Sequence, residues 1–242
     1  MSQHISRKEL KTDKIHDAIE HSAEAVYSHK QVTLIVLLVV LVVAAGYGGW
    51  SIYTDRQTAA ASAAFDIAMK AYSGRVGAGA PSDPAEPGEV TYADEAARSN
   101  DAVKKFTGVA DKYPNTNPGR LARYYQALCL EDLERQNQAL EQLKRLSTGG
   151  DKELASMAQY QTAVIYSRTG KTDEAVKIYR ALADKPSAFV SRPLALLELA
   201  GTLRQSNPKE AANVYQQIKK EFPESAIADE ADRGLETLAP NS

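Results

Sequence analysis

A period of 36 residues is the feature that most constrains how this 242-residue chain can fold. The columns in register are Ala139, Ala175 and Ala211; Leu143, Tyr179 and Tyr215; Leu146, Leu182 and Ile218; Gln138, Glu174 and Glu210; and Ala127, Ala163 and Leu199. Apolar residues recur at helical intervals around these positions. A small residue twelve positions before another lets two antiparallel helices cross closely, so each period predicts a helical hairpin. A single hairpin leaves one face bare, and stacking several buries a continuous core.

The order of small, small, aromatic and proline residues in each period resembles the tetratricopeptide repeat. Two sets of residues match its second helix and terminating proline: Ala211, Tyr215 and Pro223 in one repeat, and Ala102, Phe106 and Pro114 in another. In the middle repeat Pro186 lies one position early, and the period is longer than the usual length of about 34 residues. The resemblance covers residues 93–224 and implies an all-α fold, an α-solenoid of helical hairpins.

Other segments extend this array. Residues 57–75 have a helical pattern and are expected to form the first solenoid helix, as the first half of the Ala102 repeat. Residues 76–92 are rich in glycine and proline and are expected to form a flexible insertion. Residues 225–242 are expected to provide a capping helix and tail that cover the last exposed face.

Gly170-Lys171-Thr172 raises the question of a phosphate-binding loop. That motif needs a glycine five residues before Gly170, where this chain has Ile165, and it follows a strand. The pattern before Gly170 is helical, so we expect a turn between two helices. In the next repeat, Asn207 and Pro208 form the corresponding helix start, as N-cap and first helical residue.

Residues 31–54 carry no formal charge over 24 residues and contain twelve Val, Leu and Ile residues. About 20 apolar residues span a bilayer, so we expect a transmembrane helix at residues 32–53. A buried core helix would have to be hidden on every face. A cleaved signal peptide is the stronger alternative because residues 58–64 are rich in alanine, but a signal core has only about 7–15 apolar residues. We therefore interpret the segment as an uncleaved anchor.

Basic residues predict the orientation of this anchor. Those before it are Arg7, Lys8, Lys11, Lys14 and Lys30, and those in the twenty residues after it are Arg56 and Lys70. The excess predicts that residues 1–31 are a cytoplasmic tail, with an amphipathic helix within residues 7–28, and that the repeats lie on the opposite side. All four histidines lie in this tail without the spacing of a helical metal site, so no metal is expected.

The composition excludes several classes of function. A net charge of −2 provides no basic surface for nucleic acid. The part after the anchor has no histidine, a single cysteine at position 129 and no Gly-x-Ser-x-Gly motif. We expect no enzymatic activity and no cofactor, and the neighbouring acids Glu131 and Asp132 are interpreted as solvated helix residues.

Binding is the function that stacked hairpins favour, because the first helix of each lines a concave surface suited to a peptide or a partner helix. The resemblance to the tetratricopeptide repeat implies partner-binding residues on that surface, namely Tyr124, Glu131, Tyr160, Arg168 and Arg204. The alternative for the two tyrosines is that their rings pack between neighbouring repeats.

The combination of a short tail, one anchor and an external helical-repeat domain resembles a bacterial family, that of the ancillary Sec translocon subunit and cell division coordinator repeat domain. This resemblance implies a single-pass protein of the inner membrane with a periplasmic repeat domain. Its expected partners are the Sec translocon and periplasmic chaperones, with no nucleic acid and no small-molecule substrate. The alternatives are an anchor subunit of an envelope enzyme or of a division or outer-membrane assembly complex, and a cytosol-facing receptor for targeting peptides.

Overall fold

The computed structural model describes residues 30–77 and 90–238, which fall into two units that meet between Arg56 and Gln57. The expected amphipathic tail helix and the four histidines lie outside the described residues. Residues 78–89 of the expected insertion and residues 239–242 also lie outside them.

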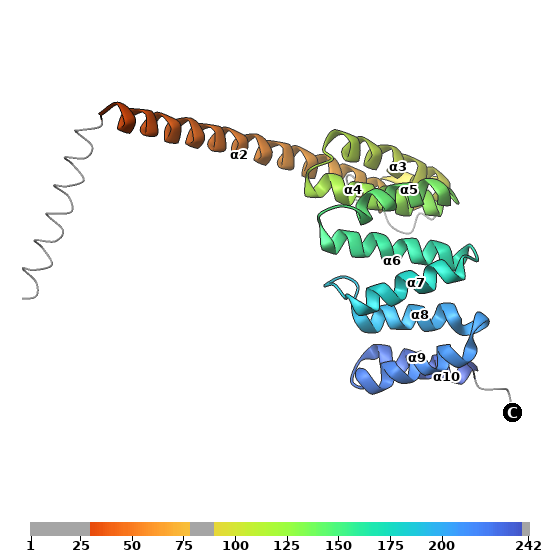
Figure 1. Ribbon diagram of the computed structural model, residues 1–242. Coiled ribbons are helices and arrows are strands. Elements are labelled where there is room, and N and C mark those ends of the chain that lie inside the picture. The colour runs from red at the N-terminus through yellow and green to blue at the C-terminus, as the bar shows by residue number, and fades with distance from the viewer. Residues whose placement is uncertain (1–29, 78–89, 239–242) are drawn as a thin grey trace, which may run out of the picture. The chain divides into compact units, whose positions relative to one another are not determined.

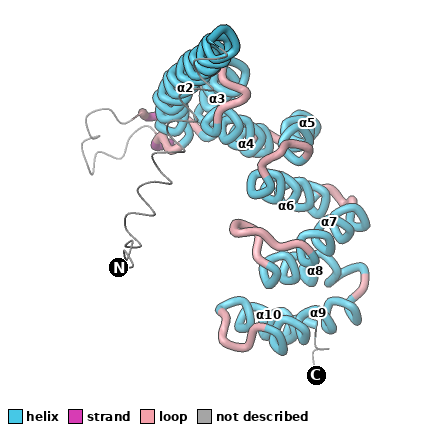
Figure 2. The backbone as a smooth tube through the Cα atoms, turned by 60° about the vertical axis from the view of Figure 1, so that its left-hand side comes forward, coloured by secondary structure: helices cyan, strands magenta, loops and turns pink. Residues whose placement is uncertain are grey.

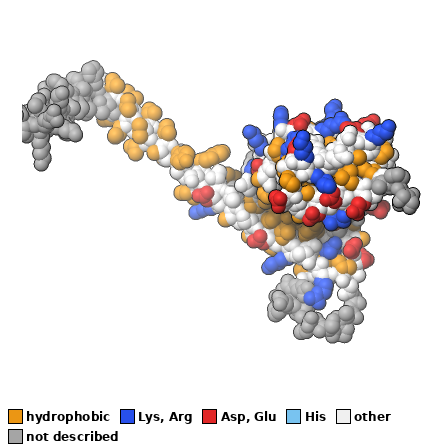
Figure 3. All heavy atoms as spheres, turned by 90° about the horizontal axis from the view of Figure 1, so that it is seen from below, with side chains coloured by type: hydrophobic (Ala, Val, Ile, Leu, Met, Phe, Trp, Pro, Cys, Tyr) orange, Lys and Arg blue, Asp and Glu red, His pale blue; other side chains and the backbone are white. Residues whose placement is uncertain are grey.

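The first unit contributes the beginning of helix α2, which runs from Lys30 to Tyr72. The Val, Leu and Ile side chains from Val32 to Val43 are each 53–64% exposed. By length and composition, α2 is the one described helix that could cross a membrane. Hydrophobic side chains cover this stretch, whereas acidic and basic side chains are spread over the repeats (Figure 3). The expected long apolar helix is confirmed.

The second unit consists of antiparallel helices connected in order, with one short bridge (Figure 1). After the end of α2 come the strands β1 (Arg75–Val76) and β2 (Thr91–Tyr92) and the helices α3 (Glu95–Lys112), α4 (Asn117–Asp132), α5 (Gln136–Ser147), α6 (Lys152–Arg168), α7 (Thr172–Asp184), α8 (Arg192–Ser206), α9 (Pro208–Glu221) and α10 (Ala226–Leu238). Each helix from α3 onward packs against the next, and α10 also contacts α8. The all-α fold of successive hairpins is confirmed.

The periodic alanines form the centre of the packing, as the period predicted. Ala139, Ala175 and Ala211 are each fully buried, and each lies one turn before a large buried side chain on the same helix. In the last two repeats these large side chains are Tyr179 and Tyr215, which belong to one continuous cluster that extends from α6 to α10. The alanines therefore occupy equivalent surroundings because their small size lets neighbouring helices approach.

The turn at Gly170 is an ordinary connection between helices. Gly170 has φ +78°, and the N–H of Lys171 donates to the carbonyl of Tyr166 at 2.8 Å, which closes the end of α6. The element before it is a helix, so the phosphate-loop reading is wrong and the turn is confirmed. The start of α9 is also as expected, since the Asn207 side chain accepts from the N–H of Glu210 at 3.2 Å and Pro208 is the first helical residue.

The first hairpin pairs the end of α2 with α3. Its core contains the buried residues Ala61, Ala68, Ala102 and Phe106. Between the two helices the chain leaves at β1 and returns at β2, and the two strands pair in parallel, with Arg75 opposite Thr91. This bridge joins the two ends of the segment that the sequence predicts to be a flexible insertion.

Candidate partner-binding face

The first helices of the hairpins form one layer of the repeat unit, and the second helices form another. Helices α4, α6 and α8 lie together on one side, with α10 beside α8, while α5, α7 and α9 lie on the other (Figure 2). All five predicted partner-binding residues belong to α4, α6 and α8. We call these three helices the first-helix layer.

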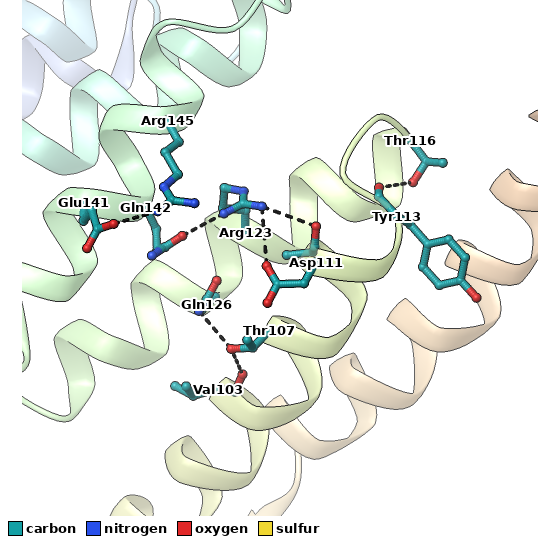
Figure 4. Close-up of polar contacts among 11 residues, drawn as sticks. Val103, Thr107, Asp111, Tyr113, Thr116, Arg123, Gln126, Glu141, Gln142 and Arg145 are labelled. Carbon is teal, nitrogen blue, oxygen red and sulfur yellow. Dashed lines mark hydrogen bonds and ion pairs between the residues drawn. The ribbon is translucent and has the colours of Figure 1, made fainter.

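Arg123 of α4 shows how polar side chains fix neighbouring helices in this unit. Its guanidinium donates to the Gln142 side chain of α5 at 2.9 Å and to the Ala110 carbonyl of α3 at 3.3 Å (Figure 4). It also lies 3.8 Å from the Asp111 carboxylate. A single side chain thus connects three helices, which sets the position of α4 within the layer.

Tyr124 is a core residue in this structure. Its side chain is 9% exposed, and it lies in the cluster of α4, α5 and α6 that includes Ala127 and Leu143. Its ring makes an edge contact with Tyr125, with centroids 5.9 Å apart. Burial raises the pKa of the Tyr124 hydroxyl. The structure therefore gives this residue the packing role that the sequence left as the alternative.

Glu131 and Arg168 are brought together across α4 and α6. The Arg168 guanidinium donates to the Glu131 carboxylate at 2.6 Å, and the Gln161 side chain donates to the other carboxylate oxygen. The Glu131 side chain is 13% exposed, whereas that of Arg168 is 71% exposed. Glu131 is thus held as an acceptor between repeats, so the interpretation of Glu131 as a solvated helix residue is wrong. Much of the Arg168 side chain remains open to a partner.

Tyr160 connects α6 to α8. Its hydroxyl donates to the Glu198 carboxylate at 2.9 Å, and its ring makes an edge contact with Tyr179 at 6.0 Å between centroids. Burial, with the nearby Glu198 charge, raises the pKa of Tyr160. The ring is half-buried, so it both packs between repeats and forms part of the surface.

Arg204 is exposed in the last turn of α8, 36 residues after Arg168 at the end of α6. The five predicted residues therefore do not form one compact cluster. Glu131 and Arg168 pair, Tyr160 and Tyr124 take part in packing, and Arg204 is a separate exposed cation. Sequence reasoning did not find Gln161 or Glu198, because neither follows a repeated column.

The second-helix layer contains grooves that the sequence did not indicate. A groove of about 730 Å³ lies between α7, the end of α8 and the start of α9, and another of about 330 Å³ lies between α5, α6 and α7. Corresponding residues line both grooves at the 36-residue spacing, for example Lys144 and Arg180. Arg180 forms an ion pair with Glu210 across the larger groove.

Within the described ranges, no group of three or more His, Cys, Asp or Glu side chains could hold a metal ion. Cys129 is fully buried, and desolvation raises the pKa of its thiol to about 12. This thiol is therefore neutral at physiological pH and poorly suited to act as a nucleophile.

A family model described as a tetratricopeptide repeat-like domain matches residues 27–235. The chain belongs to this tetratricopeptide repeat-like family. The match covers the apolar helix as well as the hairpins. Repeats of this kind indicate a protein that binds other proteins. Neither a curated protein nor a solved structure gives a significant match.

Proposed function

We propose that this tetratricopeptide repeat-like protein is a membrane-tethered scaffold of the bacterial cell envelope. In this proposal residues 1–31 are cytoplasmic, residues 32–53 cross the inner membrane, and the repeats lie in the periplasm. The main support is the continuity of one chain in which an apolar helix with uncovered side chains leads into stacked hairpins. The excess of basic residues before the apolar stretch supports the orientation.

The partners that we propose are the Sec translocon and periplasmic chaperones, acting on polypeptides as they leave the membrane. The support is the resemblance in architecture and repeat pattern, together with the family match. We propose a non-catalytic role because repeats of this kind mainly provide binding surfaces.

We propose the first-helix layer as the binding face, with Arg168 and Arg204 as its open contacts. Each guanidinium is a fixed array of donors for carboxylates and carbonyl groups of a polypeptide. Glu131, Tyr160 and Tyr124 contribute mainly by holding the layer in shape, because their polar groups or rings are engaged between helices.

Photo-crosslinking tests this face, with the probe placed where it leaves the packing intact. A photoreactive amino acid at Arg204 avoids the contacts of Tyr160 with Glu198 and Tyr179. The matched control is the same probe at Lys177, which is exposed on α7 in the other layer. We expect translocon or chaperone peptides from the Arg204 site and not from the Lys177 site. Products from Lys177 alone would move the binding face to the second-helix layer, and an enzyme as the sole product would favour an anchor subunit.

Cysteine labelling tests the topology. The native thiol of Cys129 is buried, so a Gln3→Cys or Pro240→Cys variant contributes the reactive thiol. A membrane-impermeant maleimide added to spheroplasts should label P240C and not Q3C. Labelling of Q3C would overturn the orientation, and a mature chain that begins after the Ala-rich residues 58–64 by mass analysis would show that the apolar stretch belongs to a cleaved signal.

A further inference from the structure

The connection between α7 and α8 differs from the other connections that lead into a first helix. Residues 113–116, 148–151 and 222–225 are each four residues long, whereas residues 185–191 number seven. By the 36-residue period, α8 would begin at position 188, but it begins at Arg192. The first turn of the expected helix is therefore replaced by an extended connection.

This connection displays a large apolar side chain. Phe189 is 63% exposed, and no other large apolar side chain between residues 91 and 238 is as exposed. A single exposed apolar side chain is common on protein surfaces. Phe189 differs because the backbone on both sides of it is fixed.

A tight turn around Phe189 fixes the backbone locally. The Ser187 N–H donates to the Val190 carbonyl at 3.0 Å, and the Val190 N–H donates to the Ser187 hydroxyl at 3.0 Å. Val190 itself is 2% exposed and belongs to the core. Phe189 thus lies within a closed turn, directly before the buried residue Val190.

Two contacts fix the same connection to the start of α6. The Ala188 N–H donates to the Glu153 carboxylate at 2.9 Å, and the Ser187 and Ser156 hydroxyls are 2.6 Å apart. Because these bonds already hold the backbone, a contact made by Phe189 would require little further ordering.

The place of Phe189 in the repeat unit indicates which kind of surface this side chain could contact. The connection between α7 and α8, which contains Phe189, lies at the end of the unit where α4, α6 and α8 begin (Figure 1). The end of α2 runs in the same direction as α4, because each of them is antiparallel to α3, and the ring of Tyr72 lies beside that of Tyr125 on α4, with centroids 5.4 Å apart. Gln57, where the repeat unit starts, is therefore at the same end of the unit as Phe189. Only Asp55 and Arg56 separate Gln57 from the uncharged stretch.

We propose that Phe189 inserts into the headgroup region of the bilayer, as a second membrane contact of this chain. The proposal rests on the anchoring by α2 proposed above. An aromatic ring on a fixed turn suits the boundary between headgroups and acyl chains, and the exposed Lys185 at the start of the same connection can reach lipid phosphates.

Fluorescence quenching by brominated lipids tests this contact with the full chain in vesicles. Trp50 is the only tryptophan, and its quenching in the unmodified protein reports whether α2 is in the bilayer. The W50F/F189W variant then reports on the connection alone. The matched control is W50F/T169W, because Thr169 is exposed in the turn at the opposite end of α6.

We expect loss of emission and a blue shift for W50F/F189W and no change for W50F/T169W. Quenching of Trp50 without quenching of F189W would overturn the proposal while leaving the anchor intact, and it would assign Phe189 to a protein partner. Equal quenching of F189W and T169W would also overturn it, because both ends of the hairpins would then contact lipid. Absence of Trp50 quenching would overturn both the anchor and this contact.

Discussion

The ring of Tyr215 occupies the space that a side chain at Gly234 would need. A Cβ placed on Gly234 would lie 2.4 Å from Cζ of Tyr215, closer than real contacts allow. Gly234 is on α10 and Tyr215 is on α9, so this close approach docks the last helix onto the array. Tyr215 also belongs to the column that repeats every 36 residues, which connects the docking of α10 to the periodic core.

Replacing Gly234 with alanine should therefore destabilise the C-terminal end of the array. Overpacking costs roughly 1–3 kcal/mol, offset in part by the gain of about 0.5–1 kcal/mol for alanine over glycine in a helix. Urea unfolding of the full chain in detergent, followed by circular dichroism, measures the change. Gly201→Ala is the control, since its Cβ would meet open space on α8 and should be stabilising. Equal effects of the two substitutions would contradict the packing described here.

The turns after α4 and α6 predict opposite changes in stability for two substitutions. Glu134 has φ +56° and lies 36 residues before Gly170, and the N–H of Arg135 donates to the Leu130 carbonyl at 2.8 Å, as Lys171 does to Tyr166. Left-handed backbone costs a residue with a side chain about 1–2 kcal/mol. Glu134→Gly should therefore stabilise the protein and Gly170→Ala should destabilise it, each by about 1 kcal/mol in unfolding free energy.

The same unfolding assay checks this pair. A destabilising Glu134→Gly would show that the glutamate side chain contributes more than the backbone conformation costs.

The hydrogen bond from Tyr160 to Glu198 predicts a loss of stability in Tyr160→Phe. Hydrogen bonds to charged groups contribute roughly 1.5–3 kcal/mol, and this bond joins two neighbouring repeats. Tyr166→Phe is the matched control on the same helix, because the described part of the chain shows no hydrogen bond to the Tyr166 hydroxyl. If the two variants unfolded at the same urea concentration, the Tyr160 hydroxyl would have no structural role.

The helices and their core could be predicted from the sequence because residues of the same size recur in it at a fixed spacing. Ala139, Ala175 and Ala211 each need the same small volume at a helix crossing, so the same residue type recurs at a fixed spacing. The N-cap at Asn207 is equally local, since its side chain bonds a backbone group three residues away.

The details of the candidate face could not be predicted in the same way. Glu198 accepts from Tyr160 only because α6 and α8 are neighbours, and within residues 30–77 and 90–238 no other repeat shows a corresponding bond. The rigid connection around Phe189 depends on Glu153 and Ser156, more than thirty residues away. Such contacts follow from the packed structure and leave no periodic trace in the sequence.

The Cys129 thiol should not react with thiol reagents in the native protein. It is fully buried beside Ala102 and Phe106, and its pKa is raised to about 12 by desolvation, so both access and ionisation oppose reaction. Modification by a thiol reagent in increasing urea should follow the separation of α4 from the first hairpin. Lys177→Cys supplies an exposed thiol for comparison and should react at once. Fast labelling of the unmodified protein without urea would show that α4 separates from the first hairpin under native conditions.

The raised pKa of the Tyr92 hydroxyl predicts a loss of stability in alkaline solution. Desolvation, followed by the hydrogen bond to the Asp101 carboxylate, raises its pKa from 10.0 to about 12. Below pH 10.0 the hydroxyl is protonated in both states, and its contribution to stability is complete. As the pH rises from 10.0 to about 12, the unfolded state loses this proton first, so the free energy of unfolding falls. In Tyr92→Phe this part of the decline should be absent, and urea unfolding across that range should show a shallower slope. An unchanged slope would mean that Tyr92 titrates alike in both states and that Asp101 of α3 does not hold the Tyr92 hydroxyl.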